Sequence, residues 1–360
     1  MLLRYPKRRQ PNGRWRAYSS LTMFTPLRAL PRRTVATAVV CAAGAWATGV
    51  AGVGVAAAHA RSSAHTPGVT RETTVTPVAC GSGTYEAPSD WYLPAGTPKG
   101  LVWAQHGFFE DKGMWTQFAT ELARSGDVVL ATTLPTFDLH GCTVENLGFN
   151  PPFLTAIASW FAGAGNPHGV LARSFAAATA AAGRPDLVLP KRFAFIGHSA
   201  GGEAVLYVAK QLAALSPSAF AELGGLVLAD PVASFIGDNT PSALTMLATT
   251  DLPVYAIATP PSSCNANQSG TAAVQQILRS RPFVGVQVNT GSHPDIFGSS
   301  ANILEKLVCG FPRRQNVSAT QTLAAGWLGD ELAGTTTPAL YPGGSTYDAL
   351  VKQVVISTLP

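Results

Sequence analysis

The stretch that decides the fold is Phe193-Ala194-Phe195-Ile196-Gly197-His198-Ser199-Ala200-Gly201-Gly202, an apolar run followed by a helix-forming run from Glu203. A Gly-x-Ser-x-Gly turn between a strand and a helix is the nucleophile-elbow arrangement. Such a turn strains the backbone of Ser199 and exposes its Oγ above the sheet, while Gly197 and Gly201 keep side chains out of the contact between strand and helix. The alternative is an ordinary glycine-rich turn. We therefore expect a nucleophilic serine at position 199.

A serine hydroxyl needs a general base, and the order of residues along the chain identifies one. After an elbow of this kind the order is serine, then aspartate or glutamate, then histidine. The sequence has seven histidines, and only His293 follows Ser199. It lies in a loop after the apolar run 283–288, which suits a base beyond the last strand. His198 lies inside the elbow, and we expect it to pack against the loops instead of acting as the base.

The acid must lie between the serine and the base. Asp230 is the strongest candidate because it directly ends the apolar run 225–229. It would therefore lie at the carboxyl edge of a parallel sheet, where active sites form. Asp238 is the reserve candidate in a following loop, and Asp251 precedes its strand and so belongs to the opposite edge. We expect Asp230 to accept the Nδ1 proton of His293 and to stabilise the imidazolium.

An oxyanion hole needs two backbone N–H donors. One should be the N–H of Ala200, the residue after the nucleophile. The run 102–108 ends a strand in His-Gly-Phe, and Gly107 permits the unusual backbone that the second donor needs. We therefore expect the N–H of Phe108 to be the second donor.

Aromatic residues near the predicted mouth favour an apolar acyl or alkoxy group. We expect Phe109 and Trp115 to contact the substrate, and the long segment 137–190 to lie over the site. The alternative for any single aromatic residue is ordinary core packing.

Short apolar runs alternate with helix-length stretches from about residue 80 to 311, which indicates a mostly parallel sheet with helices on both faces. Runs of this length, rich in Val, Leu and Ile, are typical of strands buried on both faces. The expected strands are 100–105, 128–132, 192–196, 225–229, 254–258 and 283–288, and the clearest helices are 114–125, 202–215 and 301–308.

Residues 98–310 resemble a secreted α/β-hydrolase. The similarity is to the branch that holds chlorophyllase-like esterases, platelet-activating-factor acetylhydrolases and polyester hydrolases. It is carried by 197–202, by Leu228-Ala229-Asp230-Pro231-Val232-Ala233 and by Gly291-Ser292-His293-Pro294-Asp295-Ile296-Phe297. The resemblance implies the α/β-hydrolase fold, the triad and ester hydrolysis, and it supports Asp230. The chain departs from the branch by one extra residue between Gly291 and His293.

The composition excludes several classes of protein. Apolar residues make up 46 % and charged residues 12 %, which excludes a disordered, collagen-like or coiled-coil chain. Residues 1–60 hold nine of the 25 basic residues and no acidic ones, so residues 61–360 carry a net charge of −4. We therefore expect no nucleic-acid partner.

Residues 26–60 have the pattern of an export signal. Three basic residues, Arg28, Arg32 and Arg33, precede an uncharged run, 35–58. Ala58-His59-Ala60 is a cleavage site, so we expect a secreted protein that begins near Arg61. An uncleaved membrane anchor is the alternative, since about 20 apolar residues span a bilayer. The export route, Sec or twin-arginine, stays open, and Met23 is an alternative start. We expect a linker over 61–78 and one domain over 79–360, with a helical extension from 312.

Export changes how the cysteines are interpreted. Outside the signal the chain has four, an even number for an oxidising compartment. We favour the pairs Cys80–Cys142 and Cys264–Cys309 over four buried thiols. No Cys-x-x-Cys or phosphate-loop pattern occurs, so we expect no metal and no cofactor.

The sequence therefore predicts a monomeric secreted esterase that acts on a small-molecule, lipid or polyester ester. The membrane would be a partner only if the apolar segment 35–58 is retained. Two alternatives remain. An acyltransferase would use the same triad, and a binding protein would keep the scaffold without catalysis.

Overall fold

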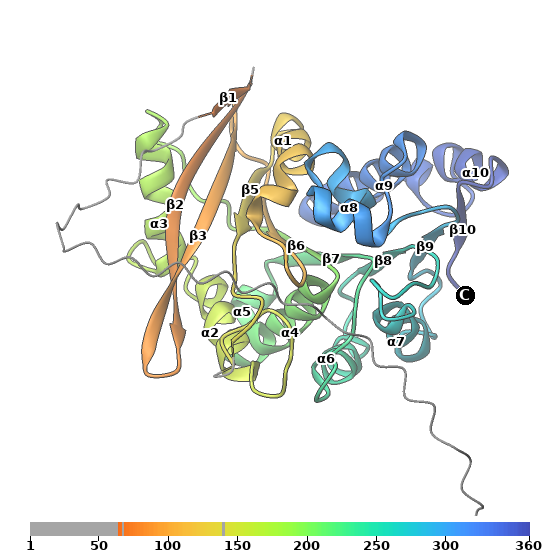
Figure 1. Ribbon diagram of the computed structural model, residues 1–360. Helices are drawn as coiled ribbons and strands as arrows, with labels where there is room; N and C mark the ends of the chain where they lie inside the picture. Colours follow the sequence, from red (N-terminus) through yellow and green to blue (C-terminus); the bar gives the residue numbers. More distant parts are fainter. Residues whose placement is uncertain (1–63, 67, 139–140) are drawn as a thin grey trace, which may run out of the picture. The chain divides into compact units, whose positions relative to one another are not determined.

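A ten-stranded sheet runs through the part of the chain that the computed structural model describes, residues 64–66, 68–138 and 141–360 (Figure 1). The strand order is β1-β2-β3-β5-β4-β6-β7-β8-β9-β10. The strands from β5 to β9 in this order are parallel, and β1, β2, β3 and β10 join the edges antiparallel. The strands are β1 Ala64–Thr66, β2 Val69–Cys80, β3 Gly83–Pro94, β4 Leu101–Gln105, β5 Val128–Thr132, β6 Phe193–His198, β7 Leu223–Ala229, β8 Val254–Ala258, β9 Gly285–Val288 and β10 Ile356–Thr358.

Helices cover both faces of this sheet, as the sequence predicts. On one face α2, α3, α4, α6 and α7 contribute to one hydrophobic core, and on the other α1, η2, α9 and α10 contribute to a second. The helices are η1 Lys112–Trp115, α1 Thr116–Arg124, α2 Pro151–Ala162, α3 Val170–Ala181, α4 Ala200–Leu215, α5 Pro217–Phe220, α6 Asn239–Leu247, α7 Ser269–Ile277, η2 His293–Ser300, α8 Ile303–Cys309, α9 Arg314–Ala333, η3 Pro338–Leu340 and α10 Ser345–Lys352.

The central strand β4 shows why apolar runs form this sheet. All five of its residues are buried. Because side chains of a strand alternate between its faces, Leu101 and Trp103 pack in the first core, and Val102 and Ala104 pack in the second. Because neither face of such a strand contacts solvent, its sequence is a nearly continuous apolar run.

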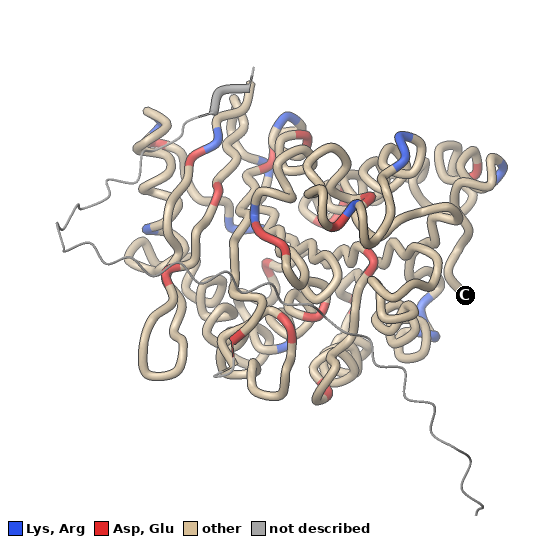
Figure 2. The backbone as a smooth tube through the Cα atoms, in the orientation of Figure 1, with Lys and Arg blue, Asp and Glu red and all other residues tan. Residues whose placement is uncertain are grey.

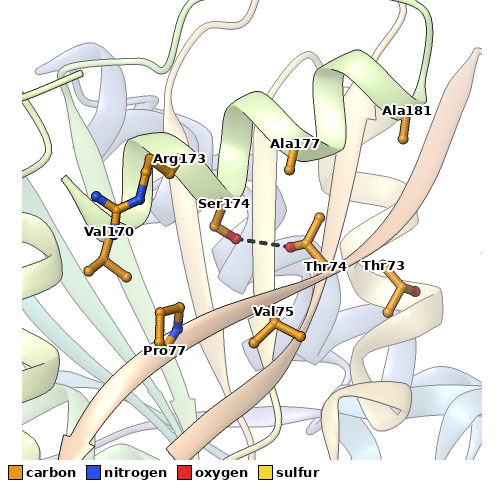
Figure 3. A pocket seen from close by; sticks show the side chains of 9 residues that line it. All are labelled: Thr73, Thr74, Val75, Pro77, Val170, Arg173, Ser174, Ala177 and Ala181. Atoms are coloured by element: carbon orange, nitrogen blue, oxygen red, sulfur yellow. Dashed lines mark hydrogen bonds between the residues drawn. The ribbon is translucent and has the colours of Figure 1, made fainter. Parts of the chain in front are cut away.

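The predicted linker over 61–78 is wrong, because β2 occupies most of it. β2 pairs with β3 along its whole length, from Val69 opposite Pro94 to Cys80 opposite Gly83. Figure 3 shows α3 lying along β2, where Thr74 Oγ1 and Ser174 Oγ are 2.9 Å apart beside a surface pocket. The threonines that suggested a linker are β-branched residues that suit a strand.

The C-terminal extension is largely helical, as predicted, but it does not end in a helix. Trp327 of α9 is buried in the second core, and α10 follows. The chain then adds β10, which pairs antiparallel with β9 through Ile356 opposite Val288. The last segment therefore closes the sheet edge beside the strand that precedes His293.

Both predicted disulfides are present. Cys80 pairs with Cys142 and Cys264 pairs with Cys309, with Cα atoms 5.6 and 5.8 Å apart. The second bond ties the loop after β8 to the end of α8.

The predictions for residues 26–60 lie outside the described residues. Within the described part of the chain, none of the helices is long and apolar enough to span a bilayer. Figure 2 shows basic residues scattered singly or in short groups among acidic ones, with no continuous basic strip. The absence of a nucleic-acid partner stays a prediction.

Candidate active site

Ser199 lies at a sharp turn between β6 and α4. Its backbone has φ 54° and ψ −124°, a conformation that costs a non-glycine residue energy and that is held by its surroundings. A Cβ on Gly197 would come within 2.2 Å of the Gly201 carbonyl oxygen, and one on Gly201 within 2.3 Å of the Gln105 carbonyl oxygen. Only glycine fits these two contacts. The turn therefore has the geometry predicted for an elbow.

Asp230 and His293 meet at the carboxyl edge of the sheet. Asp230 follows β7, His293 opens η2 beyond β9, and His293 Nδ1 lies 2.6 Å from Asp230 Oδ2. Both side chains are nearly fully buried. The pair forms because the ends of parallel strands lie along one edge, which brings together residues 63 positions apart.

The loop after β8 completes the surroundings of Asp230. Thr259 donates its N–H to Oδ1 at 2.8 Å and its hydroxyl to Oδ2 at 2.7 Å, and the Asn265 amide donates at 3.2 Å. Burial alone would raise the pKa of Asp230, but the hydrogen bonds from His293 and Thr259 and the charge of His293 lower it. The carboxyl group is therefore ionised at neutral pH.

Sequence reasoning missed Thr259 and Asn265, because the search there was for a carboxylate. A signal was available. Thr259 directly ends the strand beside Asp230, and polar residues at that edge face the same site.

The loop after β4 lies against the serine. A Cβ on Gly107 would be 2.6 Å from Ser199 Cβ, so only glycine allows this approach. Phe108, whose N–H is the predicted second oxyanion donor, follows in the chain, and Ala200 is the first residue of α4. The structure thus brings the segments that carry both predicted donors to Ser199.

The two aromatic residues predicted to bind substrate have different surroundings. Phe109 is 74 % exposed and contacts the ring of Phe108 at 4.2 Å between centroids. Trp115 is 0 % exposed and packs edge-on against Phe297, with ring centroids 5.0 Å apart. The prediction for Trp115 is wrong, since η1 turns its ring into the second core and leaves no surface for a ligand.

The alternative acids lie elsewhere. Asp238 is exposed at the start of α6, and Asp251 is exposed before β8. Neither hydrogen-bonds to His293, whose Nδ1 is bonded to Asp230. Asp230 is the carboxylate that the structure brings to the predicted base.

A second buried pair lies beside the first. His198 Nδ1 lies 2.9 Å from Glu110 Oε1, and His198 Nε2 lies 2.9 Å from the His293 carbonyl oxygen. Burial alone would lower the pKa of His198, but the charge of Glu110 and its hydrogen bond raise it to about 9. His198 packs against the loops, as the sequence predicts, but its partner Glu110 is not identified by the sequence.

Glu110, His198 and His293 are the described residues whose ligand-type atoms come close enough to hold a metal, within 4.8 Å of one another. The donor set does not fit a metal, however. Both nitrogens of His198 face hydrogen-bond acceptors, and Glu110 also accepts the N–H of Gly107 at 2.6 Å. We therefore interpret the cluster as an ion pair.

Solved structures with a similar fold are known. A ferulic acid esterase from Streptomyces cinnamoneus matches with a TM-score of 0.54 and 14 % identity, over 83 % of this chain and 98 % of that chain. The chain has the α/β-hydrolase fold.

Two further α/β-hydrolase matches are an esterase from Pseudomonas putida and a dienelactone hydrolase from Anabaena variabilis. The first has a TM-score of 0.47 and 16 % identity over 74 % of this chain and 84 % of that chain. The second has a TM-score of 0.44 and 15 % identity over 71 % and 96 %. No family model and no curated protein matches the chain. The three solved structures named above are hydrolases that share 14–16 % identity with this chain.

Proposed function

We propose that the protein is a secreted serine esterase that hydrolyses carboxylic esters through an acyl-enzyme on Ser199. The observation that carries the proposal is the 2.6 Å contact between His293 and the buried Asp230, beside a strained serine at an elbow. Each group alone occurs in many proteins. Their meeting at one sheet edge of an α/β-hydrolase supports acyl transfer.

In the proposed reaction His293 removes the proton from Ser199 Oγ as that oxygen attacks the ester carbonyl. Asp230 holds the imidazole with Nδ1 protonated and stabilises the imidazolium that forms. The N–H groups of Phe108 and Ala200 stabilise the oxyanion. The imidazolium then gives its proton to the leaving alcohol. Water attacks the acyl group, His293 accepts the water proton, and the same proton returns to Ser199 as the acid leaves.

The substrate we propose is an ester with an apolar acyl or alkoxy group, as in the chlorophyllase-like and polyester-hydrolase branch. The exposed ring of Phe109 beside the site supports this choice. Secretion is supported by the two disulfides, which persist in oxidising compartments. We further propose that the mature protein begins near Arg61, acts as a monomer and uses no cofactor.

The test is hydrolysis by the purified secreted protein of p-nitrophenyl esters of graded chain length and of polyester film. Ser199→Ala is the catalytic variant, and Ser218→Ala, at the start of α5, is a matched control. We expect turnover that Ser199→Ala abolishes and Ser218→Ala retains. Acyl transfer to an added alcohol in preference to water would favour the acyltransferase. A folded protein without turnover of any ester would overturn the proposal.

A further inference from the structure

His198 and Glu110 form a buried pair that the proposed reaction does not use. His198 is the last residue of β6 and is fully buried, and the side chain of Glu110 is 4 % exposed. Substrate therefore does not contact either group. Burying two ionisable side chains costs free energy unless they are paired and hydrogen-bonded. The hydrogen bonds of His198 and Glu110 therefore indicate which backbone segments they position.

The hydrogen bonds, together with the effect of each partner on the other's pKa, define the charge of this pair. The carbonyl oxygen of His293 only accepts, so His198 Nε2 carries a proton. His198 Nδ1 faces both carboxylate oxygens of Glu110, at 2.9 and 3.1 Å. Glu110 also accepts the N–H of Gly107, as a carboxylate does. The proton between them stays on His198, because each charge stabilises the other and so raises the pKa of His198 and lowers that of Glu110. The pair is thus an imidazolium and a carboxylate.

His106, which lies beside this pair, is in the opposite protonation state. Its Nε2 accepts the N–H of Leu134 at 3.0 Å, and its Nδ1 lies 2.7 Å from the Gly107 carbonyl oxygen. This ring is therefore neutral, and burial lowers its pKa. Gly107 is held at both ends, by Glu110 at its N–H and by His106 at its carbonyl.

We propose that His198 and Glu110 are positioning residues whose ion pair holds the Gly107 loop and the His293 backbone in place around Ser199. The proposal rests on the esterase function proposed above. His198 reaches the base through the His293 carbonyl, and Glu110 reaches the oxyanion loop through the Gly107 N–H. Both segments contact the elbow, Gly107 at Ser199 and the His293 backbone at His198.

The tolerance for movement is small. A Cβ on Gly107 would lie 2.6 Å from Ser199 Cβ, so the loop and the serine are already in close contact. A misplacement of about 1 Å can cost about 100-fold in rate. We therefore expect loss of the pair to lower kcat by about 10- to 100-fold and to leave KM within about threefold.

The charged groups around the pair give its pH dependence. Glu305 of α8 faces Glu110, and burial and the Glu110 charge raise the pKa of Glu305 to about 8. His293 and the neutral His106 are the other titratable groups beside the pair. The charge of Lys306 acts on Glu305, and the charge of Asp111 acts on His106. Near neutral pH Glu305 is protonated, so one carboxylate faces one imidazolium.

Ionisation of Glu305 above pH 8 adds a second negative charge and favours the imidazolium. The pair should therefore persist until His198 loses its proton, near pH 9. Removing the charge of Glu110 removes the main influence that raises the pKa of His198. Its proton should then be lost at a lower pH.

The experiment compares Glu110→Gln and His198→Gln with His168→Gln, an exposed histidine on another part of the chain. The glutamine at position 110 still accepts the Gly107 N–H, so it separates hydrogen bonding from charge. We measure kcat and KM for p-nitrophenyl butyrate from pH 6 to 10, with melting curves. We expect His168→Gln to match the parent protein.

We expect both site variants to lose 10- to 100-fold in kcat. The kcat of the double variant should be about equal to that of the less active single variant, because the two residues act through one pair. The alkaline limb of kcat should move down by at least about one pH unit in Glu110→Gln and disappear in His198→Gln. An unchanged kcat and pH profile in Glu110→Gln would overturn the proposal. So would a loss with the parent pH profile, since that is the result of a merely structural role.

A second measurement does not depend on turnover. Nitrogen-15 NMR of the imidazoles in Ser199→Ala should show both nitrogens of His198 protonated at pH 7. A neutral His198 ring at pH 7 would overturn the ion pair even if the protein is an esterase. A charged ring in a protein that hydrolyses no ester would instead overturn the proposed function.

Discussion

Replacing Asp230 with asparagine isolates one charge at the centre of the site. Oδ1 of Asp230 accepts the Thr259 N–H, and an asparagine oxygen can keep that bond. Oδ2 accepts from both His293 Nδ1 and the Thr259 hydroxyl, and the asparagine NH₂ must take that place. Two donors would then face a donor.

The simplest relief for this conflict is a change of tautomer. The Thr259 hydroxyl can rotate and accept, but the His293 ring must move its proton from Nδ1 to Nε2. A ring protonated on Nε2 cannot take the serine proton. We therefore expect Asp230→Asn to lower kcat by about 10⁴, which is about 5 kcal/mol of transition-state stabilisation.

The assay is ester hydrolysis by the purified variants, with melting curves to show that each one folds. Asp238→Asn and Asp251→Asn are matched controls, because both carboxylates are exposed and lie away from His293. Adding Ser199→Ala to Asp230→Asn should cost little more than Ser199→Ala alone, since the triad acts as a unit. If Asp230→Asn keeps more than about a tenth of the activity, the acid assignment fails, because tenfold is only about 1.4 kcal/mol.

Three further predictions use other parts of the structure. Phe109→Ala should raise KM for long-chain esters and leave the melting temperature unchanged, whereas Trp115→Ala should lower the free energy of unfolding by about 3–5 kcal/mol; steady-state kinetics and denaturant titration check both. Replacing Cys264 and Cys309 with serine should cost about 2–4 kcal/mol and also lower kcat, because that bond restrains the loop that holds Asp230; a stable variant of unchanged kcat would contradict this. Burial, with a nearby carboxyl group, raises the pKa of Glu145 to about 8, so the folded state holds a proton that the unfolded state has lost. Stability should fall as pH rises from about 4.5 to 8, and melting temperatures should show a weaker pH dependence in Glu145→Gln.

The sequence predicts those parts of the fold in which the type of a residue depends directly on whether it is buried or at a strand end. The strands 128–132 and 254–258 are found within those bounds, because a strand covered on both faces is almost entirely apolar. Asp230 and His293 are also found at one site, because the carboxyl ends of parallel strands share an edge. Chain order and strand ends suffice for that inference.

The parts that the sequence does not predict depend on tertiary contacts. β2 is partly exposed and has five polar residues in a row, 70–74, so it lacks the apolar pattern of a buried strand and its threonines resemble those of a linker. Whether Trp115 points toward a substrate or into the core depends on how η1 turns, which no local pattern specifies. Glu110 reaches His198 across 88 residues, so only the folded chain shows that pair.

The most direct test of the account is to label the purified protein with an alkyl fluorophosphonate and to map the modified peptide by mass spectrometry. The account predicts one adduct, on Ser199, formed in the folded protein and lost in Ser199→Ala. Labelling should slow by orders of magnitude in His293→Ala, because the hydroxyl then has no base. An adduct on a different serine, or no adduct on a protein that melts cooperatively, would contradict the assignment of Ser199 as the nucleophile.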